Sequence, residues 1–196
     1  MDNYNVFPDA AIVSSDGVSE QFSALGVDTF HHACRYVHDL PYGYNSDRDD
    51  LFVLFEEKMG SCTTKHAVIA TLAGELNLPV EKNIGIYAMT EAMVTGTDAI
   101  LARYGLPYVP MIHCFLGYGQ YRVDLTDGNA NGKNRSVTNF LYVEPVIPNI
   151  SARDEYLKYR QALKEHILKR TELAGVEMKT ILHAREEGIA LLKSHV

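Results

Sequence analysis

The stretch over residues 58–76 constrains the fold of this chain most strongly. A loop that ends in Gly60 and Ser61 leads directly into an apolar, alanine-rich run. This order predicts a helix with Ser61 at its N-cap and Cys62 in its first turn, ending near Asn77. The sequence therefore places a thiol at a helix N-terminus.

A thiol in this position has distinctive chemistry. The first backbone N–H groups of a helix are unpaired and carry about half a positive charge, which favours the thiolate over the thiol. Such thiols have pKa values of roughly 3.5–7.5, so a nucleophile is available at neutral pH. The same N–H groups can stabilise an oxyanion. A nucleophile of this kind needs a base, and the base needs an orienting group.

The length and charge of the chain narrow its class. Its 196 residues, 46% of them hydrophobic and 22% charged, suit one globular domain or one domain with an appendage. The formal net charge of −7 argues against nucleic acid as a main partner, because phosphate binding needs a basic face. No stretch resembles a membrane span or a signal peptide. Three widely spaced cysteines fit free thiols in a reducing compartment, so we expect a cytoplasmic protein.

Local patterns predict most of the other elements. Residues 1–21 suggest a short strand or an extended arm. Residues 28–40 carry apolar side chains at helical spacing, and Pro41 stops the run. Strands are expected at 84–89 and 140–143, and a short helix at 98–104 within an insertion over 90–107.

The C-terminal residues 151–196 predict two helices. Ser151 with Asp154 resembles a capping box at the start, and Gly175 is expected to break the segment. We expect this helical extension to pack on the preceding domain, residues 1–150, or on a second copy of the chain.

Two β-patterned runs, 111–116 and 120–125, predict a hairpin. If the two-residue loop is Tyr118-Gly119, His113 lies opposite Asp124, within reach of an imidazole–carboxylate hydrogen bond. A shift of one residue would undo this pairing, so it depends on the assumed loop. The other face of the hairpin is apolar and is expected to be buried; it carries Ile112, Cys114, Leu116, Tyr121, Val123 and Leu125.

Together these positions suggest a Cys-His-Asp triad. Cys62 would be the nucleophile, His113 the base, and Asp124 the group that fixes the imidazole. The main rival base is His66, one helical turn after Cys62. The rival thiol is Cys114, and the rival acid is Asp127, for which a turn role is preferred.

A metal site is the weaker alternative. His31, Cys34 and His38 lie one turn apart on the predicted helix and have the residue types of a zinc site. A single helix rarely supplies a complete set of ligands, so we favour a structural role, with Cys34 as a small core residue. No metal is therefore expected, and no organic cofactor is expected because the sequence has no glycine-rich phosphate loop of the required spacing.

The order and the local contexts of these motifs also resemble a family. Gly60-Ser61-Cys62 opening an alanine-rich helix, His113 on a strand and Asp124-Leu125-Thr126 ending the next strand look like the transglutaminase-like cysteine acyltransferase and protease superfamily. The resemblance covers roughly residues 28–126. It implies an α+β fold, with a papain-like core in which the catalytic helix packs on an antiparallel sheet. It also implies that Cys62, His113 and Asp124 are nucleophile, base and orienting acid.

The expected function is acyl transfer on an amide through a Cys62 thioester. Water as acceptor would make the protein a peptidase or deamidase, whereas an amine would make it a transglutaminase; both remain open, as does the second oxyanion donor beside the Cys62 N–H. The expected partners are a peptide, a protein or a small amide. The competing hypothesis is a transglutaminase-like binding or scaffold module that has no catalytic activity.

Overall fold

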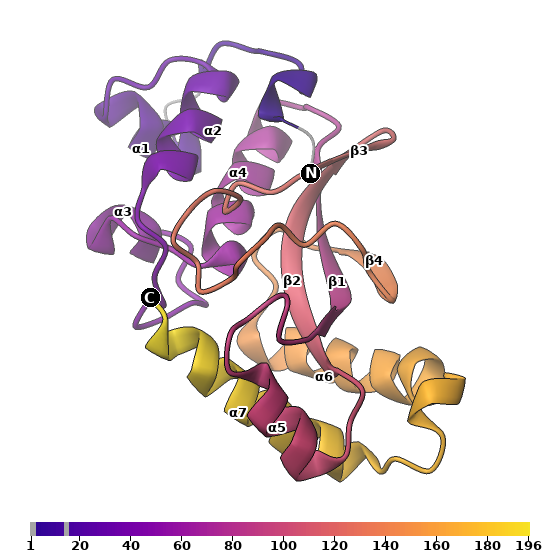
Figure 1. The fold of residues 1–196 in the computed structure, drawn as a ribbon. Helices are drawn as coiled ribbons and strands as arrows, with labels where there is room; N and C mark the ends of the chain where they lie inside the picture. The colour runs from indigo at the N-terminus through magenta and orange to yellow at the C-terminus, as the bar shows by residue number, and fades with distance from the viewer. Residues whose placement is uncertain (1–2, 14–15) are drawn as a thin grey trace.

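The computed structural model describes residues 3–13 and 16–196 (Figure 1). Short 3₁₀ turns occupy Tyr4–Val6 and Thr171–Leu173, and a π-helical turn, Leu163–Ile167, extends α6. The longer elements in this part of the chain are α1 (Gly17–Ala24), α2 (Phe30–Asp39), α3 (Val53–Glu57), α4 (Cys62–Glu75), β1 (Glu81–Met89), α5 (Thr97–Tyr104), β2 (Val109–Tyr118), β3 (Tyr121–Val123), β4 (Tyr142–Val146), α6 (Ala152–Ala162) and α7 (Met178–Ser194).

The strands form one sheet in the order β3-β2-β1-β4, and every neighbouring pair is antiparallel. β1 pairs with β2 along its whole length. On its other edge, residues 82–86 of β1 pair with β4. Helices α1 to α4 lie toward one end of the sheet in Figure 1, and α5 to α7 lie toward the other. The expected α+β class is confirmed.

Helix α4 is buried around its whole circumference. Each residue from Cys62 to Ala70 is buried, including the polar Thr63, Thr64, Lys65 and His66, and the helix has no single polar face. α1 and α2 pack against one side of the helix and β2 against the other, in a core that includes Phe22, Phe30 and Ile69. The thiol-bearing end of α4 is therefore fixed from several directions.

Two buried cations tie neighbouring segments to α4. Lys65 donates through Nζ to the carbonyls of His38 (3.1 Å) and Leu40 (2.6 Å) and to Oδ1 of Asn129 (2.6 Å). Burial lowers the pKa of Lys65 to about 8. Lys82 of β1 donates to the carbonyl of Thr63, in the first turn of α4, at 3.1 Å. The loop after β3 and strand β1 are thus both anchored at this helix.

The C-terminal helices share a second core with the sheet. Ser151 caps α6 by accepting the N–H of Asp154 at 3.0 Å, as the sequence predicts. Gly175, with a φ of 81°, separates the two helical parts. Tyr159 of α6 and Ile181 of α7 are buried in a cluster that also contains Ile86, Met89 and Met111 of the sheet. The predicted helical hairpin therefore packs against β1 and β2.

The N-terminal expectation was wrong for residues 17–24, which form helix α1 rather than an extended arm. Glu75, at the end of α4, accepts the N–H groups of Val18 (2.9 Å) and Ser19 (2.8 Å) and so satisfies the first turn of α1. This capping comes from a residue 56 or 57 positions away, so local patterns do not reveal it. Within the part predicted as an extended arm, Ala11 forms a single antiparallel bridge with Thr29. Residues 1–2 and 14–15 lie outside the described residues.

The hairpin register also differs from the expectation. The loop is Gly119-Gln120, and Leu116 pairs with Val123 instead of Tyr121. Gly119 has a φ of 56°, a conformation that glycine adopts far more easily than tyrosine, so the turn forms one residue later. The register is shifted by two residues, which keeps each side chain on its predicted face.

The second face of the hairpin is more buried than expected. His113 and Phe115 are only 1% and 2% exposed. The ring of Phe140 stacks on that of Phe115 with 4.9 Å between centroids, so the segment before β4 covers this face. On the apolar face, Cys114, Leu116, Val123 and Leu125 are buried as predicted, whereas Ile112 is half-buried and Tyr121 is exposed.

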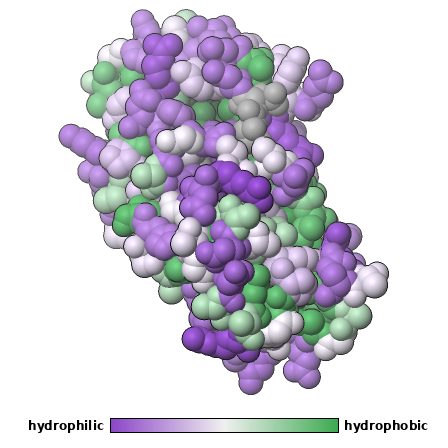
Figure 2. All heavy atoms as spheres, viewed as in Figure 1, coloured by the Kyte–Doolittle hydropathy of each residue, from purple (hydrophilic) through white to green (hydrophobic). Residues whose placement is uncertain are grey.

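The molecular surface is mainly hydrophilic in the view of Figure 2, with hydrophobic side chains gathered toward the end where α5 lies in Figure 1. Among the described residues, no helix combines the length and the hydropathy needed to traverse a bilayer.

Two glycine substitutions are expected to change stability in opposite directions. A Cβ at Gly85 of β1 would lie 2.3 Å from the ring of Phe140, so Gly85→Ala should lower the free energy of unfolding by about 1–3 kcal/mol. A Cβ at Gly74 of α4 meets nothing within 4 Å, and Gly74→Ala should raise it by up to about 1 kcal/mol. Urea unfolding of both variants tests this; equal effects would contradict the assigned packing.

Candidate active site

The loop before α4 leaves no space for a side chain at Gly60. A Cβ there would lie 2.7 Å from Oγ1 of Thr64 and 3.1 Å from Cδ1 of Leu54. Ser61 occupies the N-cap position as predicted, although its side chain makes no capping hydrogen bond. Cys62 is the first residue of the helix and is 8% exposed. The thiol therefore lies at the helix N-terminus, with a small opening to solvent.

A second loop brings an aromatic hydroxyl to the same point. The N–H of Gly60 donates to the carbonyl of Pro41 (3.1 Å), and that of Gly43 donates to the carbonyl of Gly60 (3.3 Å). Tyr42 lines the same cavity as Cys62, its hydroxyl faces the backbone N–H of Cys62, and burial raises the pKa of Tyr42 well above its usual value. The phenol therefore stays protonated at neutral pH at the N-terminus of α4.

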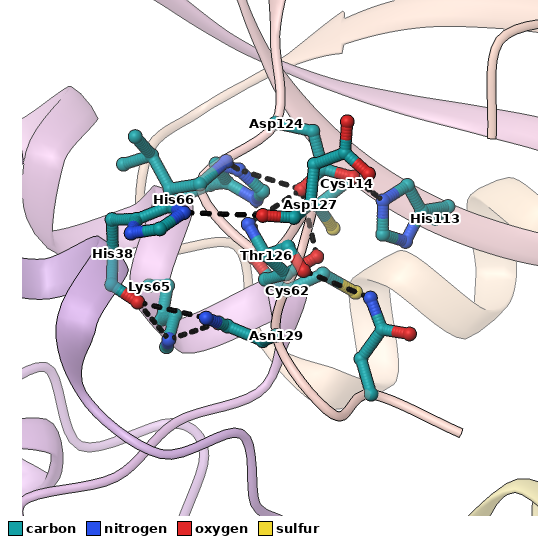
Figure 3. A network of polar contacts seen from close by, with 12 residues as sticks. His38, Cys62, Lys65, His66, His113, Cys114, Asp124, Thr126, Asp127 and Asn129 are labelled. Atoms are coloured by element: carbon teal, nitrogen blue, oxygen red, sulfur yellow. Dashed lines mark hydrogen bonds and ion pairs between the residues drawn. The ribbon is translucent and has the colours of Figure 1, made fainter. Parts of the chain in front are cut away.

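His113 and Asp124 meet although they are not paired across the hairpin. Asp124 follows the last residue of β3, and its Oδ2 lies 2.6 Å from Nε2 of His113 (Figure 3). Its other oxygen, Oδ1, accepts the backbone N–H of Thr126 at 2.8 Å and the Thr126 hydroxyl at 2.7 Å. Thr126 thus holds the carboxylate in the orientation that reaches the imidazole.

This geometry fixes which nitrogen of His113 is available. Because the carboxylate of Asp124 can only accept, Nε2 carries the proton and donates to it. Nδ1 is buried and has no hydrogen-bond partner. Burial by itself lowers the pKa of His113, but the charges of Asp124 and Cys62 outweigh it and raise the pKa to about 9. The imidazole therefore favours its protonated form while Nδ1 remains free.

The surroundings of Cys62 favour a thiolate. The largest influence is the neighbouring Cys114 thiol, which shares a small buried cluster with Cys62 and lowers the pKa of Cys62. Burial opposes this, but the charges of His113 and Lys133 act in the same direction as Cys114. The pKa of Cys62 is therefore held well below its usual value. The interaction with Cys62, together with burial, raises the pKa of Cys114, which therefore stays a thiol.

Replacing Cys114 should therefore weaken the thiolate. In Cys114→Ala the hydrogen-bond donor is lost, and we expect the pKa of Cys62 to rise, whereas Cys114→Ser keeps a donor and should largely preserve it. The pH dependence of Cys62 alkylation, followed by mass spectrometry, measures the midpoint. Cys34→Ala, in a separate core cluster, is the matched control and should leave the midpoint unchanged. An unchanged midpoint in Cys114→Ala would contradict this role.

His66 has no nitrogen free to act as a base. Its Nε2 accepts the backbone N–H of Leu125 at 2.8 Å, so its proton lies on Nδ1, which donates to the carbonyl of Cys62 at 2.7 Å. Burial lowers the pKa of His66 to about 4, and the ring is neutral at pH 7 although Nε2 lies 3.5 Å from Asp124. His66 connects α4 to the residues that carry the carboxylate.

The rival acid, Asp127, also has structural partners. Oδ1 of Asp127 accepts the hydroxyl of Ser136, and the backbone carbonyl of Asp127 accepts Nε2 of His38 at 3.1 Å. Neither group forms a hydrogen bond with His113, whose partner is Asp124.

The residues considered for a metal site are directed at separate partners. Nε2 of His31 donates to the carbonyl of Phe7 at 2.8 Å, and His38 bonds to Asp127 as described. Cys34 is fully buried in the core, and burial raises the pKa of its thiol. Within residues 3–13 and 16–196, no three His, Cys, Asp or Glu side chains gather as a metal site would require.

A cavity of about 270 Å³ opens in front of Cys62. Its wall includes Tyr42, Ser61, Tyr87 and His113 and continues onto Ile189 of α7. A larger hollow of about 350 Å³, between β1 and residues 135–141, contains neither Cys62 nor His113. The cavity with the thiol is therefore the candidate active site, although other hollows are larger, among them one of about 570 Å³ beside the β2–β3 turn.

Sequence reasoning missed several residues of this site. Thr126 follows Asp124 by two positions, and this spacing is typical of a turn in which an Asp side chain accepts a nearby N–H, so a local signal existed. Tyr42 lies in a turn-rich loop that was expected to be exposed and able to line a cleft beside Cys62, but no role was predicted for its hydroxyl. Arg48, Glu155 and Lys133 reach the cavity from distant segments, and no local pattern identifies them.

Comparisons with known proteins found no match for the chain among family models, curated proteins or solved structures.

Proposed function

We propose that this protein is a cysteine-dependent enzyme that transfers the acyl group of an amide through a Cys62 thioester. The observation that carries the proposal is the free Nδ1 of His113, buried beside Cys62 while Nε2 is held by Asp124 at 2.6 Å. A purely structural histidine at such depth would be expected to use both nitrogens, as His66 does. The packing of α4 on an antiparallel sheet supports a transglutaminase-like core.

In the first half of the reaction, the Cys62 thiolate attacks the amide carbonyl carbon and the carbonyl electrons move to oxygen. The Cys62 N–H donates to this oxyanion, and the Tyr42 hydroxyl, which lies against that N–H, would be the second donor. As the C–N bond breaks, the proton on Nδ1 of His113 passes to the leaving amine. The product is a thioester on Cys62.

In the second half, water or an amine attacks the thioester carbonyl. Nδ1 of His113 takes the proton of the attacking group, and Asp124 stabilises the imidazolium that results. The C–S bond then breaks and the thiolate is restored. Hydrolysis gives a peptidase or deamidase and amine capture gives a transglutaminase, and both fit the same residues. Three free cysteines suit a reducing compartment, and we propose a cytoplasmic location.

The test is the pH dependence of Cys62 alkylation by iodoacetamide in the wild-type chain and in His113→Ala. The wild-type thiol should react well below its usual pKa, because the imidazolium stabilises the thiolate. The variant should lose most of this reactivity at pH 6 and need a higher pH to recover it. Acylation of the wild-type enzyme should decline above about pH 9, where His113 loses the proton that the leaving amine needs.

His66→Ala is not a suitable control, because it would remove buried structural hydrogen bonds. His183→Ala, at an exposed position of α7, is the matched control and should react like the wild type. A Cys62 that is unreactive, or indifferent to His113, would reject the enzyme and favour a binding module.

A further inference from the structure

The unsatisfied polar atoms of the structure are concentrated in one place. Among the described residues, five buried side-chain nitrogen or oxygen atoms have no hydrogen-bond partner. They are Nε and Nη2 of Arg48, the hydroxyl of Tyr87, Nδ1 of His113 and Nε of Arg185. All four residues line the cavity in front of Cys62. Because buried donors are normally paired, this concentration indicates a site built to be completed by a ligand.

The same cavity is strongly cationic. Its wall contains Arg48, Lys133, Arg185 and Lys193, and Glu155 as the one carboxylate. The chain as a whole has a formal net charge of −7, so this is a local excess against the general charge of the protein. The imidazolium of His113 is balanced by the Asp124 carboxylate, so the Cys62 thiolate and Glu155 oppose the four cations and leave an excess of two positive charges. The remaining positive charge therefore faces whatever enters the cavity.

Among these cations, Arg48 has the largest number of unpaired N–H groups. Its Nη1 donates to Oε1 of Glu155 at 3.0 Å, which fixes the guanidinium at the edge of the site. Its Nε and Nη2 remain without a partner. A guanidinium presents its N–H groups in a planar fork that matches the oxygens of a carboxylate or a phosphate.

The other three cations are held by aromatic rings. Lys133 lies over the ring of Tyr42 at 5.5 Å, and Lys193 lies over that of Tyr44 at 4.9 Å. Arg185 lies 4.9 Å from the centre of the Tyr159 ring. None of the three forms an ion pair with a carboxylate in the described part of the chain. Their charges are positioned without being neutralised.

We propose that the cavity binds an oxyanionic group of the acyl substrate, a carboxylate or a phosphate, and that the enzyme acts on anionic amides. This inference rests on the proposed function for its chemistry, and it adds the substrate class. Arg48 and Arg185 would complete their hydrogen bonds on the anion, while Lys133 and Lys193 supply the field that draws it toward Cys62. A volume of about 270 Å³ suits a small acidic group rather than a long segment of polypeptide.

The test compares iodoacetate with iodoacetamide, two reagents with the same reacting carbon and different charge. Second-order rates of Cys62 alkylation are measured on the native full chain at low salt, with the urea-denatured chain as reference. The ratio of the iodoacetate rate to the iodoacetamide rate should be at least about tenfold higher in the native protein, and added NaCl should reduce it. Because both reagents consume the same thiolate, a change in the thiolate fraction cancels in this ratio.

Two variants locate the effect. Lys133→Gln and Arg185→Gln should each lower the native ratio several-fold, and neither leaves a paired carboxylate behind. Arg153→Gln removes an exposed charge from α6 outside the cavity and is the matched control, with an unchanged ratio expected. In the wild-type chain, glutarate and inorganic phosphate should protect Cys62 from iodoacetamide beyond NaCl of equal ionic strength. Stronger protection by glutarate assigns a carboxylate substrate, and stronger protection by phosphate assigns a phosphorylated one.

The possible failures can be told apart. A native ratio equal to the denatured reference, without protection by either anion, overturns the anion site while a reactive Cys62 still supports the enzyme. If Cys62 does not react with iodoacetamide, the proposed function fails, and calorimetric titration of Cys62→Ala with glutarate and with phosphate decides the anion site separately. Absence of saturable binding to either anion would then overturn it.

Discussion

Replacement of Cys62 by alanine should reduce turnover of any amide that the wild-type chain cleaves or transfers by at least about 10⁴-fold. The variant lacks the atom that forms the thioester, and the remaining groups offer no other route to a covalent intermediate. His113 and Asp124 stay paired with opposite charges, so no isolated charge is left in the interior. The fold should therefore be retained.

The measurement is initial-rate kinetics on a substrate found by screening acidic peptides and amides, together with thermal unfolding to check the fold. Cys34→Ala is the matched control, because it removes a buried thiol from the core away from the cavity. It should keep wild-type turnover within about twofold. Turnover near the wild-type level by Cys62→Ala would reject the thioester mechanism.

Asp124→Asn is expected to lower turnover by about 10⁴-fold although the two side chains have nearly the same shape. The reason lies in Thr126, whose N–H and hydroxyl both donate to Oδ1 of Asp124. An asparagine must turn its amide oxygen toward these two donors, so its NH₂ faces Nε2 of His113. His113 then has to place its proton on Nδ1, and the neutral ring can no longer accept a proton beside Cys62.

The same substitution should lower the pKa of His113. Burial already opposes the charged imidazole, and the carboxylate that outweighs burial is gone. NMR titration of the ring measures this shift, and the tautomer follows from the nitrogen chemical shifts. Asp127→Asn, three residues further on, is the matched control, because Asp127 bonds to Ser136 instead. Equal losses in the two variants would mean that Asp124 has only a structural role.

Several features of the fold and the site could be predicted from local signals. Gly60-Ser61-Cys62 before an apolar run predicted the start of α4 and its thiol, because capping and helix propensity depend on neighbouring residues. The strand that carries His113 and the capping box of α6 were predicted for the same reason. Asp124 was placed near His113 even though the hairpin register was wrong. A shift of two residues keeps the alternation of faces, and Asp124 reaches the imidazole from beyond the strand end.

The sequence by itself therefore determined where the candidate nucleophile and its base lie on their own elements. Only the tertiary structure decided how these elements meet. It decided that Cys114 lies in one buried cluster with Cys62, that Thr126 orients Asp124, and that Arg48, Lys133 and Arg185 surround one cavity. These contacts join residues from five separate elements and loops, and each becomes favourable only after the cores on both sides of the sheet have formed. Helix capping and hydrophobic periodicity can be predicted from neighbouring residues in the sequence. Burial, charge pairing and cavity shape depend on the whole folded chain.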